Sequence, residues 1–308
     1  MGIQSKITRL RNNWRNLRTR QFWEDVLIYY LSKIIYPQNK GVFIIEEEWD
    51  NLIILDACRY DSFKEEFEKR NMKGKLTYKI SRGSGTPEFL VENFGNRKFD
   101  DIIYITANPY VDLLLQGRFY KIISVWKDGW SEEYNTVLPS TMYEYTLDAL
   151  VKYPDKRFII HFMQPHYPFI SLKVEGDTGI KHQREATLAG ETVWQDITIW
   201  GLMKAGIVSF EDVIKGYKEN LSLALDYVEK LVDILPGTTV ITADHGEAFG
   251  EKLHPLIPIR VYGHYNGVRI EPLIKVPWLV VDEKDKILKK PEKLKIKQAI
   301  KKLNNKTK

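Results

Sequence analysis

The sequence predicts an α/β domain built on a mostly parallel or mixed sheet, with helices covering both faces. Short apolar runs recur along the 308 residues, and several of them end in an aspartate or a histidine. Amphipathic helical patterns separate these runs, and strands that alternate with helices are typical of such sheets. The composition, 44% hydrophobic and 28% charged residues, is ordinary for a globular protein with a substantial core.

The apolar runs give the predicted strands in chain order. The first reads "NLIILDA", with four consecutive apolar residues before Asp56, which is typical of a buried strand with a polar end. Strands are predicted at residues 51–57, 100–108, 120–126, 157–169, 238–246 and 275–282, and the fourth runs into a loop rich in histidine and proline. Helices are predicted at 1–37, 61–71 and 209–235, the last ended by Pro236 and Gly237. Residues 170–208 show no clear period, which indicates a long insertion over the sheet edge.

The two ends of the chain differ from the body in charge. Residues 1–20 contain six basic and no acidic side chains, and residues 283–308 contain eleven lysines and three acidic residues. Since the whole chain has a net charge of +5, residues 21–282 carry −9. An acidic body is not expected to bind nucleic acid, which leaves only the tails for that role. Basic ends instead favour solvated tails or attachment to anionic lipid.

The N-terminal helical pattern has two interpretations. Apolar residues recur at helical spacing with arginines on the other face, so the helix either packs on the domain or lies flat on a membrane. No stretch is long enough to span a bilayer, and no signal-peptide cleavage site is present. Cys58 is the only cysteine, so no intramolecular disulfide can form. We therefore expect a cytoplasmic protein that is peripheral to a membrane if its ends bind lipid.

Polar side chains at predicted strand ends indicate a metal site. Asp56 follows one buried run, and Asp244 and His245 follow another in "TADHGE". Two carboxylates with one imidazole suit a divalent cation, with Mn²⁺ or Zn²⁺ preferred and Mg²⁺ or Ca²⁺ as alternatives. Gly246 would allow close approach of the backbone after the histidine. The alternative for a single aspartate in such a position is a helix cap or a turn residue.

Thr86 is the candidate nucleophile. It follows a Gly-Ser-Gly run, and Pro87 and Glu88 suit the first turn of a helix, so Thr86 is predicted as the helix N-cap. Free amides and the helix dipole favour an anion there, and a hydroxyl bound to a divalent cation is more easily deprotonated. The alternative is a capping threonine with no chemical role.

Five elements in order resemble the alkaline phosphatase superfamily, and within it the sulfatase-like branch. They are "LIILDACRYDSF", "GTPEF", "HFMQPHYPF", "TADHGEAFGE" and "YGHYNGVRIEPLIKVPWLVV", and they extend across residues 51–282. The resemblance implies a three-layer sandwich with a mostly parallel central sheet and helices on both faces. The resemblance does not cover residues 1–40 or the lysine-rich tail. Together with the sequence pattern of the two ends, it predicts three segments: a basic amphipathic helix at 1–40, a sulfatase-like catalytic domain at 41–282 and a lysine-rich tail at 283–308.

The resemblance implies roles for individual residues. Asp56, Thr86, Asp244 and His245 would bind one divalent metal, and Thr86 would also be the nucleophile. His166 and His264 would contact the substrate's phosphoryl or sulfuryl oxygens or protonate the leaving oxygen, and His161 is a further candidate for substrate binding. A final candidate, Arg59, either approaches an anionic substrate or faces the following helix and pairs with an acid.

The sequence departs from true sulfatases in two ways. Threonine cannot become formylglycine, and Cys58 lies in "CRYDS", outside the motif that is modified, so it is expected to be a small buried residue. The Asp-x-x-x-His pair of two-metal members is absent, since Asp177 and His182 are one residue too far apart. One metal is therefore expected, with histidines stabilising the remaining oxygens.

These features predict a metal-dependent hydrolase or transferase acting on phosphoesters through a covalent intermediate on Thr86. The substrate would be a small-molecule, lipid-linked or glycan-linked phosphoester. The alternatives are a sulfuric ester hydrolase without formylglycine and an inactive binding module that keeps the fold.

Overall fold

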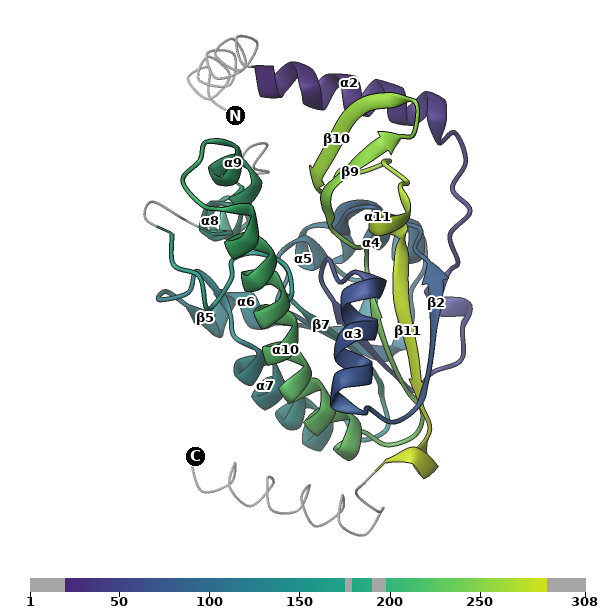
Figure 1. Ribbon diagram of the computed structural model, residues 1–308. Coiled ribbons are helices and arrows are strands. Elements are labelled where there is room, and N and C mark those ends of the chain that lie inside the picture. The colour runs from purple at the N-terminus through teal and green to yellow at the C-terminus, as the bar shows by residue number, and fades with distance from the viewer. Residues whose placement is uncertain (1–19, 175–178, 190–197, 287–308) are drawn as a thin grey trace.

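The computed structural model describes residues 20–174, 179–189 and 198–286. Within them, seven strands form a central sheet in the order β2-β11-β8-β1-β7-β3-β4 (Figure 1). Their bounds are β1 Asn51–Leu55, β2 Lys75–Ile80, β3 Phe99–Thr106, β4 Phe119–Ser124, β7 Arg157–Phe162, β8 Thr239–Ala243 and β11 Lys275–Val281. Strands β8, β1, β7, β3 and β4 pair in parallel, whereas β11 runs antiparallel to both β8 and β2. The predicted mostly parallel, mixed sheet is confirmed.

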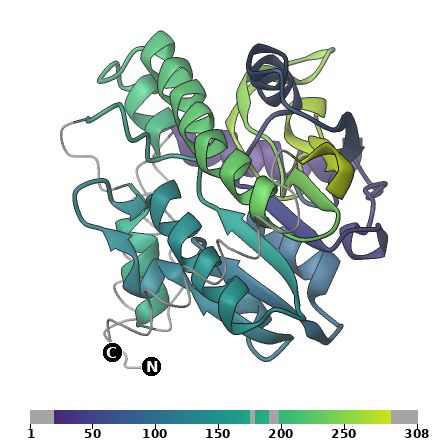
Figure 2. The ribbon, with the colours of Figure 1, turned by 90° about the horizontal axis from the view of Figure 1, so that it is seen from below.

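Helices cover both faces of this sheet, as predicted (Figure 2). Alternate residues of β1 point to opposite sides: Ile53 and Leu55 belong to one buried cluster, and Leu52 and Ile54 to the other. The first cluster includes residues of α3 (Tyr60–Arg70), α6 (Val125–Asp128), α7 (Pro139–Lys152) and α10 (Phe210–Ile234). The second includes residues of α4 (Thr86–Phe94) and α5 (Tyr110–Leu115). Burial of every residue of β1 explains its continuous apolar run.

The predicted strands and the helices at 61–71 and 209–235 correspond to observed elements. Helix α10 begins after Ser209, whose side chain accepts a hydrogen bond from the amide of Asp212, and it ends two residues before Pro236. The strand predicted at 157–169 ends earlier, at Phe162, and the one predicted at 238–246 ends at Ala243. Both ends matter because the residues that follow them form the candidate site.

Two elements near the site were not predicted. Strand β2 is largely exposed and lies on the sheet edge, so its sequence lacks the apolar run of a buried strand. A hairpin of β9 (Ala248–His254) and β10 (Ile257–Gly263) extends from the end of the sheet and connects two of the quoted motifs. The shorter elements are η1 (Ile44–Glu46), β5 (Trp130–Ser131), β6 (Thr136–Val137), α8 (Lys181–Leu188), α9 (Ile199–Lys204), α11 (Glu271–Ile274) and η2 (Glu283–Asp285).

Helix α2 (Arg20–Ile35) is the described part of the predicted N-terminal helix. Ile28 is buried in a cluster with Leu253 and Val261 of the hairpin, so one face of α2 packs on the domain. Residues 1–19 and the lysine-rich segment from 287 lie outside the described residues, as does Asp177. No described helix combines the length and apolar character that a bilayer crossing requires.

Candidate active site

Two carboxylates meet at the carboxyl ends of neighbouring strands. Asp56 follows β1 and Asp244 follows β8, and these strands pair in parallel with Leu55 opposite Ala243. Both aspartates are buried. One oxygen of Asp244, Oδ1, accepts hydrogen bonds from the amides of Ala57 (3.1 Å) and His245 (2.9 Å). These bonds fix the carboxylate and leave Oδ2 facing the centre of the site.

Thr86 brings its hydroxyl to the same centre. The structure corrects one detail, because Gly85 is the N-cap of α4 and Thr86 is its first helical residue. The Thr86 hydroxyl therefore does not cap the helix: Oγ1 lies 2.7 Å from Asp244 Oδ2, 3.5 Å from Asp56 Oδ2 and 3.3 Å from His245 Nε2. A side chain at Gly85 would meet Asn266 Oδ1 at 2.6 Å, which explains the glycine before the threonine.

The four predicted ligands fit a divalent cation. Asp56 Oδ1 is buried without a hydrogen-bond partner in the described part of the chain, and it lies 3.6 Å from His245 Nε2. His245 Nδ1 contacts the carbonyl oxygen of Gly246 (2.8 Å) and acts as the donor, which leaves the Nε2 lone pair free for a metal. Burial and the neighbouring Asp244 hold the pKa of Asp56 well above its usual range. A cation at this point would offset the repulsion between the carboxylates.

Gly246 meets the backbone that follows the hairpin. A Cβ at this position would lie 2.0 Å from the carbonyl oxygen of Pro272, and the Gly246 amide donates to the carbonyl of Leu273 (2.8 Å). The close backbone approach predicted for this glycine is confirmed, and it holds His245 against α11.

Asn108 is a site residue that sequence reasoning missed. Its Nδ2 donates to Asp56 Oδ2 (2.6 Å), and its own Oδ1 accepts from the amide of Tyr110 (2.9 Å). The amide occupies one oxygen of Asp56 and leaves the other free for a cation. The sequence did contain a signal, because Asn108 ends the predicted strand 100–108 as Asp56 and Asp244 follow theirs.

His161 lies deeper than a substrate contact. It is fully buried on β7, with Nδ1 3.0 Å from the hydroxyl of Tyr104. Its Nε2 lies 3.9 Å from Asp56 Oδ2 and 3.8 Å from Asp244 Oδ2, with no hydrogen-bond partner in the described residues. Burial lowers the pKa of His161 to about 4, so the ring is neutral near pH 7. Asp56, Asp244 and His161 could therefore also hold a cation.

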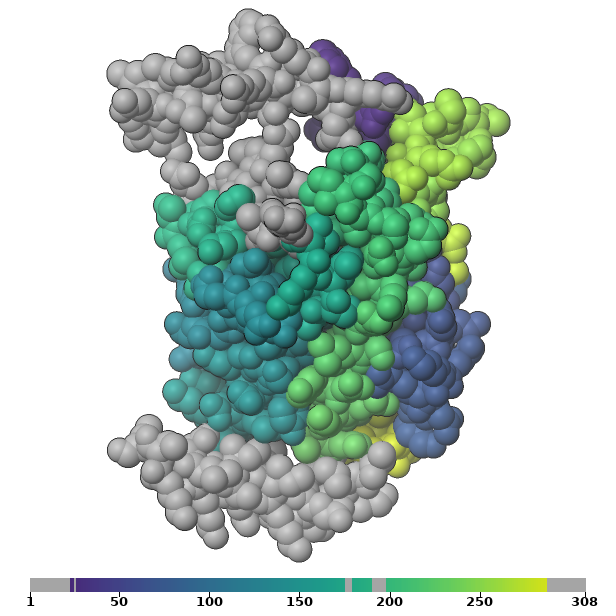
Figure 3. Space-filling view, turned by 60° about the vertical axis from the view of Figure 1, so that its left-hand side comes forward, coloured from purple at the N-terminus to yellow at the C-terminus, as the bar shows by residue number. Residues whose placement is uncertain are grey.

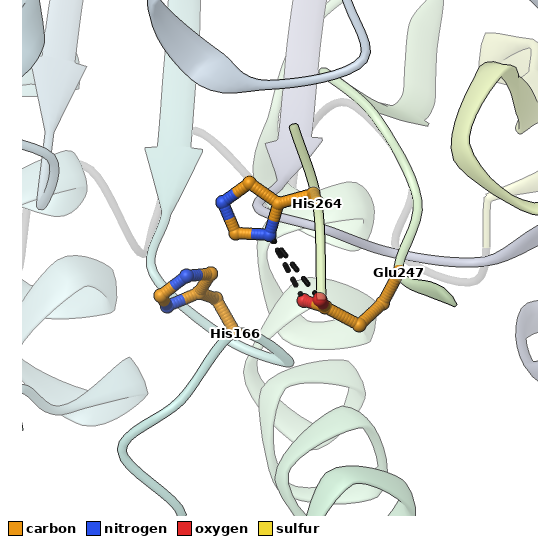
Figure 4. Close-up of side chains that lie close together, drawn as sticks. All are labelled: His166, Glu247 and His264. Atoms are coloured by element: carbon orange, nitrogen blue, oxygen red, sulfur yellow. Dashed lines mark hydrogen bonds and ion pairs between the residues drawn. The ribbon is translucent and has the colours of Figure 1, made fainter. Parts of the chain in front are cut away.

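His166, Glu247 and His264 form a second cluster beside the first (Figure 4). His264 Nδ1 lies 3.2 Å from both carboxylate oxygens of Glu247. The rings of His166 and His264 have centroids 5.2 Å apart, and that of His245 lies 4.4 Å from His264. The two predicted histidines are thus brought together next to the predicted metal ligands. Glu247, though part of the quoted motif, had no predicted role.

The second cluster has an uneven charge distribution. Burial alone would lower the pKa of His264, but the adjacent Glu247 carboxylate raises it above its usual value. Burial would likewise raise the pKa of Glu247, and the facing His264 lowers it instead. Burial, with a smaller contribution from His264, lowers the pKa of His166 to about 4. His264 therefore holds a proton more readily than His166, and Glu247 stays ionised.

Glu88 ties the Thr86 turn to the loop that contains His264. One carboxylate oxygen, Oε2, accepts from the Ser84 amide and hydroxyl (both 3.0 Å) and from the Gly267 amide (3.1 Å). The other oxygen pairs with the guanidinium of Arg269. Four donors on two separate segments therefore converge on one carboxylate, which fixes the distance between the turn at Thr86 and the loop that contains His264.

Arg59 and Cys58 support the structure around the site. The guanidinium of Arg59 pairs with Asp61 (2.6 Å) and Glu251 (2.6 Å) and donates to the carbonyl of Glu247 (2.8 Å). This geometry matches the alternative in which Arg59 pairs with an acid rather than approaching the substrate. Cys58 is fully buried, as predicted, and burial holds the pKa of its thiol well above the usual range.

Comparisons with known proteins give limited similarity. No family model matches the sequence, and no curated protein matches it. Solved structures that resemble the chain include the soluble domain of lipooligosaccharide phosphoethanolamine transferase A from Neisseria meningitidis, with 12% identity, a TM-score of 0.47 and coverage of 75% of each chain. Another is the C-terminal periplasmic domain of EcEptC from Escherichia coli in complex with Zn, with 14% identity, a TM-score of 0.44 and coverage of 75% of this chain and 72% of that chain. A third is a protein in the alkaline phosphatase superfamily from Vibrio parahaemolyticus, with 12% identity, a TM-score of 0.39 and coverage of 78% and 60%, respectively.

Proposed function

We propose that the protein is a metal-dependent enzyme that transfers the phosphoryl group of a phosphoester to Thr86 and then to water or another acceptor. The observation that supports this most directly is the position of Thr86 Oγ1, which lies within 3.5 Å of Asp56, Asp244 and His245 at the start of α4. The ordered motifs of the alkaline phosphatase superfamily, including its sulfatase-like branch, support the same reaction class.

In this proposal Asp56, Thr86, Asp244 and His245 hold one divalent cation, Zn²⁺ or Mn²⁺. When bound, the cation lowers the pKa of the threonine hydroxyl and offsets the charge of the phosphoryl oxygens. The hydroxyl proton of Thr86 leaves along its hydrogen bond to Asp244 Oδ2. The Thr86 oxygen then forms a bond to phosphorus as the bond from phosphorus to the leaving oxygen breaks. The amides at the N-terminus of α4 favour the anionic group there.

His264 and His166 transfer protons at the leaving and the entering oxygen, respectively. His264, whose pKa is raised beside Glu247, donates a proton to the leaving oxygen. His166, which is neutral near pH 7, accepts a proton from the water or alcohol that attacks the phosphothreonine. The attacking oxygen forms a bond to phosphorus as the bond from phosphorus to Thr86 breaks. Thr86 regains its proton from Asp244, and the proton held by His166 returns to His264 through solvent. Glu247 holds His264 in place throughout.

A second candidate reaction uses the same site on a sulfate ester. The cation and the histidines recognise tetrahedral anions in general, so the geometry at Thr86 does not by itself select phosphorus. We propose phosphoesters because threonine cannot form the formylglycine that true sulfatases use. The substrate class is a small-molecule, lipid-linked or glycan-linked phosphoester.

Hydrolysis assays test the reaction class. Aryl phosphodiester, phosphomonoester and sulfate ester are each incubated with wild type, Thr86→Ser and Thr86→Ala in Zn²⁺, Mn²⁺ or Mg²⁺. We expect metal-dependent release from a phosphoester, lost by about a thousandfold or more in Thr86→Ala and partly kept in Thr86→Ser. Full activity in Thr86→Ala, or faster release from the sulfate ester, would contradict the proposal.

Bound-metal analysis separates an enzyme from an inactive binding module. We expect wild type to bind one equivalent of Zn²⁺ tightly, Asp244→Ala to bind none, and Glu247→Gln to keep one. Loss of an equivalent in Glu247→Gln would place a tightly bound cation in the second cluster instead. Absence of metal from wild type after incubation with Zn²⁺ would favour the binding module.

A further inference from the structure

Helix α2 carries apolar side chains on two different faces. On one face Ile28 is buried, and Leu31 and Ile35 pack against the same cluster of the β9–β10 hairpin. The hydroxyl of Ser32, buried on this face, donates to the carbonyl of Ile28 (2.6 Å). These contacts account for one side of the helix only.

The other face exposes a stripe of large apolar residues, which we call the α2 stripe: Leu27, Tyr30 and Ile34. They are 47%, 62% and 76% exposed, and their spacing of three and four residues places them in one row along the helix. Trp23 lies in the same row one turn earlier and is 56% exposed. Surface helices normally place polar residues on the face away from the core. Among the described residues the α2 stripe is therefore left exposed and is available to an apolar partner.

We propose that the α2 stripe inserts into the surface of an anionic lipid bilayer. Two observations select a membrane as the occupant. The 20 residues up to the start of α2 contain six basic and no acidic side chains, which complements an anionic surface. The stripe contains tyrosine and is extended by tryptophan, the side chains enriched where apolar and aqueous phases meet.

The orientation that follows links the membrane to the candidate site. Helix α2 packs on the β9–β10 hairpin, which begins one residue after Glu247 and ends one residue before His264. Figure 3 shows α2 beside the hairpin at one end of the molecule. A bilayer against the α2 stripe would therefore lie at the same end as the second cluster. This orientation favours phosphoesters carried by lipid head groups or held close to the membrane, a substrate class that rests on the proposed function.

Vesicle sedimentation of the full chain tests the docking itself. Wild type is compared with L27Q/Y30Q/I34Q and with a matched control, Y78Q/V91Q/Y120Q, whose three residues are each 52% exposed on other elements. Vesicles contain phosphatidylcholine alone or phosphatidylcholine with phosphatidylglycerol, at low and raised salt. Circular dichroism and hydrolysis of a soluble aryl ester establish that both variants are folded.

We expect wild type and the control to bind only the vesicles with phosphatidylglycerol and to stay partly bound at raised salt, because inserted apolar side chains are not screened. The stripe variant should bind about tenfold more weakly, and it should be released by salt.

Equal binding by the stripe variant, or no binding by wild type, would overturn the proposal. A wild-type dimer that becomes a monomer in the stripe variant, measured by sedimentation without vesicles, would also overturn it and assign the stripe to a second copy. Thr86→Ala should bind vesicles like wild type, so failure of the proposed reaction and failure of the docking are separate results.

Discussion

The hydroxyl oxygen of Thr86 lies 2.7 Å from Asp244 Oδ2, although 158 residues separate the two positions in the sequence. The contact forms because α4 starts beside the carboxyl end of β8, and β8 pairs with β1, which ends one residue before Asp56. Three distant segments thereby place one hydroxyl, two carboxylates and one imidazole at a common point.

We expect Asn108 to fix the orientation of Asp56 as a metal ligand. Replacing Asn108 with alanine leaves Asp56 Oδ2 buried without its amide donor. Such a loss costs about 1–3 kcal/mol of the free energy of unfolding of the metal-free protein. The affinity for Zn²⁺ should also fall by about 10- to 100-fold, because Asp56 is no longer oriented. Denaturant unfolding and metal titration measure the two effects, and Asn96→Ala, an exposed asparagine, serves as control. Unchanged metal affinity would show that Asn108 does not position the ligand.

The pH dependence of the reaction should report His264. If His264 donates a proton to the leaving oxygen, kcat/KM falls as pH rises through its raised pKa. Glu247→Gln removes the ionised partner of His264, so burial becomes the main influence and lowers the pKa of His264. The fall in kcat/KM should therefore occur at lower pH. A phosphodiester is the suitable substrate because it does not titrate in this range. Glu251→Gln, which loses a partner of Arg59 instead, is the control. A fall at the same pH in Glu247→Gln would argue against His264 as the acid.

Glu88 should act by positioning. Glu88→Gln weakens the charged bonds that join the Thr86 turn to the His264 loop, so kcat should fall by about 10- to 100-fold through misplacement of the reacting groups. Because Glu88 contacts none of the four proposed ligands in the hydrogen bonds described here, the bound-metal content should stay at the wild-type value. Glu92→Gln on the same helix, whose carboxylate pairs with Arg82 (2.7 Å), should leave kcat unchanged. An equal fall in kcat in Glu88→Gln and Glu92→Gln would contradict this role. It would mean that a change anywhere on the surface of α4 lowers kcat, whether or not the residue connects to the His264 loop.

The sequence predicted the parts of the site that are local. Buried strands read as apolar runs, and a polar residue directly after such a run, as at Asp56 and Asp244, marks the strand end. Local sequence does not show which strands are neighbours in the sheet. Strands β1 and β8 are neighbours, yet nearly 190 residues separate their ends. The predicted metal site required these ends to meet, and the resemblance of the ordered motifs supported it, but no local pattern established that they do.

The positioning residues could not be predicted for the same reason. Glu88 followed a proline in an expected first turn, and nothing local indicated that Gly267 and Arg269 would donate to it. The N-cap assignment at Thr86 failed because capping statistics favour threonine, whereas here Asp244 takes its hydroxyl and glycine occupies the cap. Strand β2 was missed because an exposed edge strand has no apolar run.

The most direct test of the central claim is to capture the covalent intermediate. Wild type and Thr86→Ser are mixed with the aryl phosphoester and Zn²⁺ and quenched in acid during turnover, and their peptides are analysed by mass spectrometry, with Thr86→Ala as control. The account predicts a phosphoryl-containing adduct on the peptide with residue 86, absent from the alanine variant. Turnover without an adduct at residue 86, or an adduct on another residue, would contradict Thr86 as the nucleophile.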